Sequence, residues 1–169
     1  MTAEALGTGL LVMAVIGSGI MASRLSPADV GLQLLENAAA TTGALIGLIL
    51  VFGGVSGAHF NPVVTWVDRA FGSIATVDAV GYTVAQVVGG SLGAVVANLM
   101  FDLRAVSWSS TTRSSGPLWL SEVVATVGLL LVIHGCVRGG RRSAVPYAVG
   151  VWIGGAYWFT SSTSFANPA

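Results

Sequence analysis

The fold is decided by residues 57–71, which read GAHFNPVVTWVDRAF. Asn is a favoured helix N-cap and Pro suits the first helical position, so a helix is predicted to run from Asn61 to Phe71. At 1.5 Å per residue this helix reaches roughly 16 Å, about half of a bilayer core of about 30 Å. The residues before it look non-helical, and such backbone lies at membrane depth only inside protein or beside water. If the surrounding sequence spans a membrane, the stretch predicts a re-entrant half-helix beside an aqueous pathway.

The composition of the chain is that of an integral membrane protein. Hydrophobic residues make up 54% of the 169 residues and charged residues 8%, where soluble domains carry about 25% charged residues. The seven basic residues, all arginine, are balanced by seven acids, so no basic stripe exists and a nucleic-acid partner is excluded. The single cysteine, Cys136, cannot form an intrachain disulfide.

Five long uncharged or nearly uncharged runs predict an all-α membrane protein with five transmembrane helices. Strands of a β-barrel would alternate polar and apolar residues, which these runs do not. A polar loop over residues 24–36 is predicted between the first two. The five predicted spans are Ala5–Ser23, Asn37–Ala58, Ala79–Phe101, Leu118–Val137 and Ser143–Ala169.

The orientation in the membrane is predicted from the arginines. The dense turn R-G-G-R-R over residues 138–142 belongs in the cytoplasm by the positive-inside rule. Counting spans back from it places the N-terminus in the cytoplasm of a multi-pass protein of the cell membrane. Arg24, Arg104 and Arg113 then lie outside.

An internal repeat organises the chain. Each half consists of helical spans opened by a glutamate, followed by an Asn-Pro box. Three spans per half would invert the second half relative to the first, as in transporters whose site lies between inverted repeats. The predicted parts are a first repeat over residues 1–101, an extracellular linker over 102–117 and an incomplete second repeat over 118–169. By symmetry, about 40 further residues are expected to follow and to form a half-helix and a sixth span. The matching segments are Glu4–Thr8 with Glu122–Thr126, and Asn61-Pro62-Val63 with Asn167-Pro168-Ala169.

Three Gly-x-x-x-Gly pairs predict seams where helices cross closely. They are Gly43 with Gly47, Gly89 with Gly93, and Gly150 with Gly154.

The ionisable residues inside the spans leave more than one function open. Glu4 and Glu122 suit either a scaffold that accepts backbone N–H groups or the coupling site of an ion- or proton-driven carrier. His59 fits either a packed histidine or a titrating gate, and His134 fits a packed residue. Neither histidine has a second ligand at metal spacing, so no metal and no cofactor are predicted. No nucleophile–base pairing is apparent, so an enzyme is not predicted.

Several motifs resemble the major intrinsic protein family, the aquaporins and aquaglyceroporins. Residues 56–65, SGAHFNPVVT, are similar to its first Asn-Pro-Ala box, with Val63 where alanine is usual. Asn167-Pro168-Ala169 matches the second box. Residues 3–9, 82–90 and 121–126 resemble its first, third and fourth helices. The resemblance implies an aquaporin-like inverted repeat in the lipid bilayer, a homotetramer and passive conduction of water and small uncharged solutes. A coupled carrier and a non-conducting fragment remain the alternatives.

The resemblance also implies roles for individual residues. The Asn-Pro boxes lie at the pore, where two half-helix dipoles exclude ions and protons. The carbonyls of Gly57, Ala58 and His59 line the pathway, and Glu4 and Glu122 support the two loops. The selectivity ring is carried over by spacing to Thr41, Gly155 and Ser164, with a fourth position just past Ala169. Three small residues predict a wide, polar ring that admits glycerol and neutral metalloid hydroxides.

Overall fold

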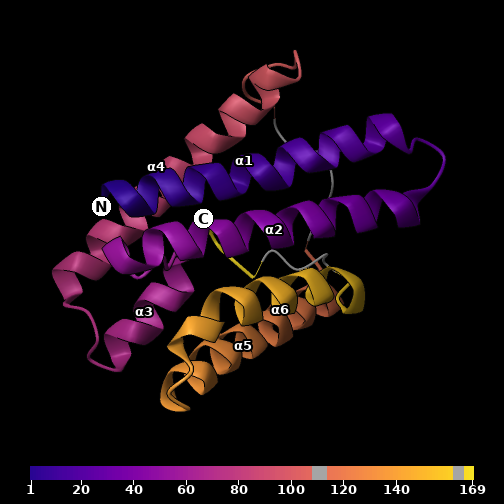
Figure 1. The fold of residues 1–169 in the computed structure, drawn as a ribbon. Coiled ribbons are helices and arrows are strands. Elements are labelled where there is room, and N and C mark those ends of the chain that lie inside the picture. Colours follow the sequence, from indigo (N-terminus) through magenta and orange to yellow (C-terminus); the bar gives the residue numbers. More distant parts are fainter. Residues whose placement is uncertain (108–113, 162–165) are drawn as a thin grey trace. The chain divides into compact units, whose positions relative to one another are not determined.

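The computed structural model describes residues 1–107, 114–161 and 166–169, and in these ranges the regular secondary structure is entirely helical (Figure 1). This confirms the all-α prediction. The elements are α1 (Thr2–Leu25), α2 (Val30–Ser56), α3 (Pro62–Ala70), α4 (Thr76–Met100), α5 (Gly116–Arg138), the 3-10 turn η1 (Arg142–Ala144) and α6 (Val145–Phe159).

Four of these helices, α1, α2, α4 and α5, are long and apolar enough to cross a membrane. The fifth predicted span forms a helix of only 15 residues, α6, which follows η1. Its length of about 22 Å is shorter than the bilayer core. Pro146 in the first turn sets its start, and Thr160 takes an extended conformation at its end. The predicted half-helix is α3, with nine residues.

The predicted polar loop over residues 24–36 is wrong for most of its length. α1 continues to Leu25 and α2 already begins at Val30. The reason is local: the Asp29 carboxylate accepts a hydrogen bond from the Leu32 N–H at 2.9 Å, which is the capping interaction of a helix N-terminus. The first turns of α2 are therefore a polar extension of an apolar helix.

The contacts between Cα atoms divide the chain into two compact units. The first contains residues 1–17, 47–106 and 167–169, and the second contains residues 18–46 and 107–166. Both α1 and α2 contribute to each unit, so the units do not coincide with the sequence repeats. The repeat boundaries at residues 101 and 118 stay a prediction.

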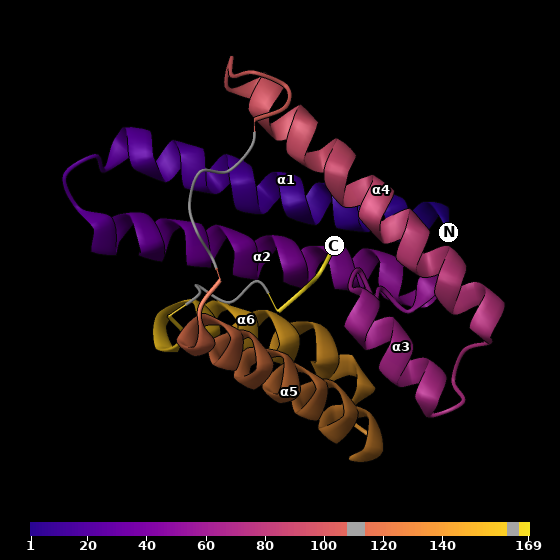
Figure 2. The same cartoon turned by 180° about the vertical axis from the view of Figure 1, so that it is seen from behind.

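In the first unit, α4 packs on the N-terminal part of α1 through glycines. A Cβ atom at Gly89 would clash with the Ala5 carbonyl oxygen, and one at Gly93 would clash with the Gly9 carbonyl oxygen. The two backbones are thus in direct contact, which confirms the close crossing predicted for this pair. The short helix α3 lies beside α4 (Figure 2).

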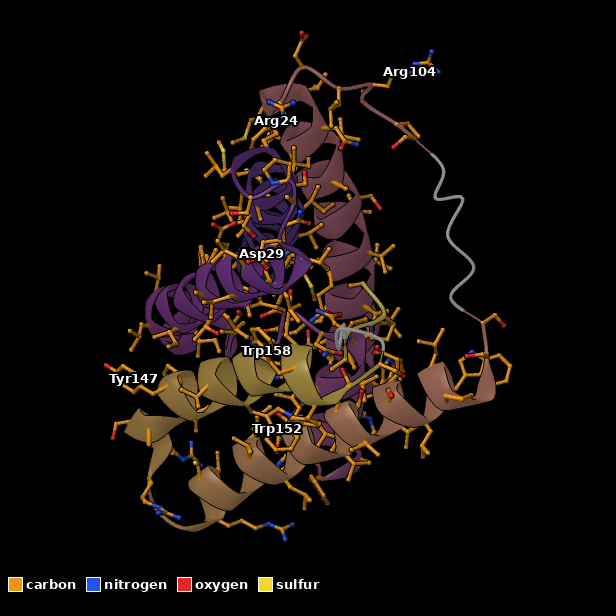
Figure 3. The ribbon with its side chains drawn as sticks, turned by 90° about the vertical axis from the view of Figure 1, so that its right-hand side faces the viewer. Arg24, Asp29, Arg104, Tyr147, Trp152 and Trp158 are labelled. Atoms are coloured by element: carbon orange, nitrogen blue, oxygen red, sulfur yellow. The ribbon has the colours of Figure 1, made fainter. Side chains whose placement is uncertain are left out.

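In the second unit, α5 and α6 lie side by side (Figures 1 and 2). Figure 3 shows Trp152 between them, and its Nε1 donates to the Ala125 carbonyl at 3.0 Å. The ring occupies the space that a Cβ atom at Gly128 would need. This aromatic packing, rather than a small-residue seam, joins the two helices.

The remaining glycine pairs behave differently from each other. Cβ atoms at Gly150 and Gly154 would clash with Ile46 and Thr42 of α2, so this pair forms the predicted crossing. The predicted seam at Gly43 and Gly47 is wrong within the described residues, where a Cβ atom at either would meet open space. α2 contacts α6 through Thr42 and Ile46, which lie beside these glycines in the sequence.

Candidate functional site

The first Asn-Pro box starts α3 through a side-chain cap. Asn61 is extended (φ −151°, ψ 120°), and its Oδ1 accepts a hydrogen bond from the Val63 N–H at 2.9 Å. Pro62 occupies the first turn, where no N–H is needed. The N-terminus of a helix carries about half a positive charge, so α3 presents a fixed positive end at Asn61.

The loop before Asn61 has an unusual backbone. Gly57, Ala58 and Phe60 have positive φ angles of 85°, 51° and 49°. For residues other than glycine this left-handed conformation costs roughly 1–2 kcal/mol each. Phe60 is held there by its buried ring, which packs edge-on to Phe52 at 6.0 Å and occupies the space beside Gly7.

The Glu4 carboxylate holds the backbone N–H groups of this loop. Glu4 is fully buried, and its two oxygens accept from His59 N at 3.1 Å and Phe60 N at 2.7 Å. Ser56 Oγ and Gln86 Nε2 also donate to it. A buried carboxylate with several donors is compensated for its lost hydration.

The same contacts set the direction of the loop carbonyls. In a trans peptide the N–H and the preceding C=O point in opposite directions. Because the N–H groups of His59 and Phe60 point at Glu4, the carbonyls of Ala58 and His59 point away from it. The Ala58 N–H points at Ser56 Oγ at 3.2 Å, so the Gly57 carbonyl points away from that hydroxyl. The three carbonyls are therefore free of the Glu4 network.

Two residues of α4, Gln86 and Tyr82, complete the network and were not among the predicted site residues. Gln86 Nε2 bridges from Glu4 to Thr65 Oγ1 at 3.0 Å, and Thr65 Oγ1 donates to the Asn61 carbonyl at 3.0 Å. The Tyr82 hydroxyl donates to the Ser56 carbonyl at 3.0 Å, at the end of α2. A glutamine and a tyrosine one turn apart in an apolar run were the signal in the sequence.

The His59 side chain is packed rather than open to solvent. Its Nδ1 lies 3.1 Å from Thr65 Oγ1, its Nε2 lies 3.2 Å from Asp68 Oδ2, and its ring meets Tyr82 edge-on at 5.4 Å. The partnership with Asp68, nine residues along the chain, was not predicted. No cluster of three or more His, Cys, Asp or Glu side chains that could hold a metal occurs in the described ranges.

The second Asn-Pro box repeats the contacts of the first. Asn167 Oδ1 accepts from the Ala169 N–H at 3.0 Å, two residues on, as Asn61 does from Val63. Residues 166–169 are not helical. The preceding residue, Ala166, has φ 45° and donates its N–H to Glu122 Oε2 at 2.8 Å, as Phe60 does to Glu4.

One contact joins the two boxes inside the first unit. Asn167 Nδ2 donates to the Phe60 carbonyl at 2.8 Å, so the second asparagine lies directly against the loop of the first. One of its two N–H bonds is thereby used on the protein.

The residues carried over to the selectivity ring lie in the second unit as far as they are described. Thr41 of α2 is 2% exposed and its hydroxyl contacts Tyr157 of α6. Gly155 of α6 is exposed, and a Cβ atom there would meet open space. Ser164 lies outside the described residues. His134 of α5 is half-buried.

Comparison with known proteins identifies the family. A sequence profile described as "Major intrinsic protein" matches residues 1–169. The chain is 50% identical over 167 residues to "Aquaglyceroporin AqpS" of Rhizobium meliloti (strain 1021), covering 99% of this chain and 71% of that protein. It is 31% identical over 166 residues to "Aquaporin Z" of Photorhabdus laumondii, covering 89% of this chain and 71% of that protein. The chain therefore belongs to the major intrinsic protein family.

Proposed function

We propose that the protein is a passive channel for water and small uncharged solutes. The observation that carries the proposal is the hydrogen bond from Asn167 Nδ2 to the Phe60 carbonyl, which brings the two Asn-Pro boxes together. Family membership supports a channel rather than an enzyme, and the name of the 50% identical relative supports conduction of glycerol. The proposal includes the cell membrane as location, a cytoplasmic N-terminus and a homotetramer.

The chemistry of conduction follows from groups fixed by the backbone. The carbonyls of Gly57, Ala58 and His59 accept hydrogen bonds from a solute, and the carboxamides of Asn61 and Asn167 donate to it. Together they replace the water shell of a neutral polar molecule. The positive end of α3 repels cations, including hydrated protons.

The contacts of Glu4 favour a channel over a coupled carrier. A coupling site needs a carboxylate that binds and releases an ion, whereas Glu4 is buried and accepts from four donors of its own protein. Its proposed role is to support the loop, and Glu122 takes the same role beside Ala166.

We expect conduction to depend on the solute gradient alone. In proteoliposomes containing the natural gene product, glycerol flux should be the same with and without a pH gradient or a membrane potential, because the helix dipole and donors do not move. The measurement is stopped-flow light scattering under each imposed gradient, with protein-free liposomes as control. Accumulation of glycerol against its own gradient would show a coupled carrier instead.

The proposed ring of Thr41, Gly155 and Ser164 has small side chains and should pass glycerol and neutral metalloid hydroxides. Filling it with rings, in the double variant Thr41→Trp/Gly155→His, should keep water flow and reduce glycerol flow by roughly tenfold or more, since steric exclusion acts on the larger solute. A matched control is Gly43→Ala, on the open side of α2. Equal glycerol flow in parent and double variant would mean that the constriction lies elsewhere.

A further inference from the structure

A pair of buried hydroxyl groups joins α2 to α6 beside the proposed ring. Thr41 Oγ1 and Tyr157 OH lie 3.1 Å apart, and the two residues are 2% and 7% exposed. Thr41 Oγ1 also lies 3.3 Å from Asn37 Oδ1, one helical turn earlier. The three side chains form one chain of hydrogen bonds within the second unit.

The donors and acceptors in this series of hydrogen bonds can be assigned. An amide oxygen only accepts, so the single proton of Thr41 goes to Asn37. Thr41 is then the acceptor of its other contact, and the proton of Tyr157 goes to Thr41. Each hydroxyl has therefore given its proton to the protein, and neither can donate to a passing solute.

The packing of the helices fixes the positions of these three side chains. Gly150 and Gly154 allow α6 to approach α2 at Ile46 and Thr42 so closely that a Cβ atom would clash. At the other end, Asn37 Nδ2 lies in the space beside Gly19, 2.8 Å from where a Cβ atom would stand. Tyr157 is thus fixed relative to Thr41 by glycine contacts on the same helix.

We propose that Tyr157 is a specificity-determining residue that acts by donating to the Thr41 oxygen, so that this oxygen is not left to accept a hydrogen bond from the solute. The inference rests on the proposed function and deepens it. With the hydroxyl engaged, the ring position at Thr41 is less polar than the sequence suggests, and the open space at Gly155 provides the width. Such a ring suits neutral solutes that combine hydroxyl groups with an apolar C–H face, as glycerol does. It is less suited to a solute that is polar all round its edge, as urea is.

The test compares glycerol and urea permeability in proteoliposomes containing the natural gene product. Tyr157→Phe removes one hydroxyl and leaves the Thr41 oxygen open to accept a hydrogen bond from the N–H groups of urea, while the Thr41 proton stays on Asn37. We expect the glycerol-to-urea permeability ratio to fall by about threefold or more, the size typical of gaining or losing one hydrogen bond. Thr41→Val should not lower the ratio, because it removes the accepting oxygen and leaves no acceptor at this ring position.

Two further variants separate this role from a merely structural one. In a Thr41→Val background, Tyr157→Phe should no longer lower the ratio, because the accepting oxygen of Thr41 is already absent. Tyr147→Phe is the matched control, since Tyr147 stands on the same helix, is 54% exposed and points away from α5 in Figure 3. It should behave as the parent does.

Several results would overturn the inference. It fails if Tyr157→Phe conducts with the parent ratio, or if its effect persists in the Thr41→Val background. It also fails if Thr41→Val alone lowers the ratio by threefold or more, and this result can be obtained even when Tyr157→Phe does not fold. A parent that passes neither glycerol nor water would overturn the proposed function itself, which is a separate and earlier result.

Discussion

Replacing Glu4 with leucine is expected to prevent folding of the first unit. The substitution leaves four donors without their acceptor: two backbone N–H groups of the loop, the Ser56 hydroxyl and the Gln86 amide. Each buried unpaired donor costs about 1–3 kcal/mol, and the sum rivals the total stability of about 5–15 kcal/mol of a typical protein. The measurement is the fraction of monodisperse protein in detergent against temperature, which should show no cooperative transition.

Glutamine at the same position should give a graded effect, because the amide keeps one acceptor. Placed with its oxygen at Oε2, it still accepts from Phe60 N and Gln86 Nε2. Its NH₂ group then meets the Ser56 hydroxyl, which can rotate and accept, and the His59 N–H, which cannot. One stranded backbone donor predicts a loss of about 1–3 kcal/mol for Glu4→Gln.

The control for both variants is Glu36→Gln in α2. Glu36 is half-buried and accepts from Ser26 Oγ, a hydroxyl that can reverse its direction. A change of no more than about 1 kcal/mol is expected there, because only one hydrogen bond of this carboxylate is affected. Should Glu4→Leu melt at the parent temperature, the loop would have to be held by something other than this carboxylate.

The local rules of helix capping made the first box predictable from sequence. Asn-Pro specifies a helix start by itself, and α3 begins and ends within one residue of the predicted half-helix, with Asn61 and Phe71 as its caps. The family resemblance was equally accessible, because its motifs are contiguous in the chain. Both features depend on residues close together in sequence.

Contacts between distant residues could not be predicted in the same way. Gln86 lies 82 residues from Glu4, and Tyr157 lies 116 residues from Thr41. The polar contacts of an apolar helix depend on how the helix is rotated about its axis and where it crosses its neighbours. When polar residues lie on several sides of a span, its sequence determines neither the rotation nor the crossing point. The length of α6 was missed for a related reason: an uncharged run permits a long helix but does not require one.

Among the glycines, substitution at the α1–α4 crossing should have the second largest effect. An alanine methyl at Gly93 would be forced onto the Gly9 carbonyl oxygen, and one at Gly89 onto that of Ala5. These neighbours are backbone atoms that cannot rotate away, so the helices must separate. Overpacking typically costs about 1–3 kcal/mol per site, and we expect Gly89→Ala/Gly93→Ala to lose at least that much.

The separation should also impair conduction, because Gln86 lies one turn before Gly89 on α4 and donates to Glu4 across the same crossing. Moving α4 outward lengthens that hydrogen bond and releases the loop that Glu4 holds. Water permeability per folded protein should therefore fall together with thermal stability.

The matched control is Gly43→Ala/Gly47→Ala in α2, where a methyl group meets open space in the described residues. That variant should be as stable as the parent or slightly more so, since alanine favours a helix over glycine. If both pairs had the same effect, the loss would reflect glycine content in general and not the contact of α4 with α1.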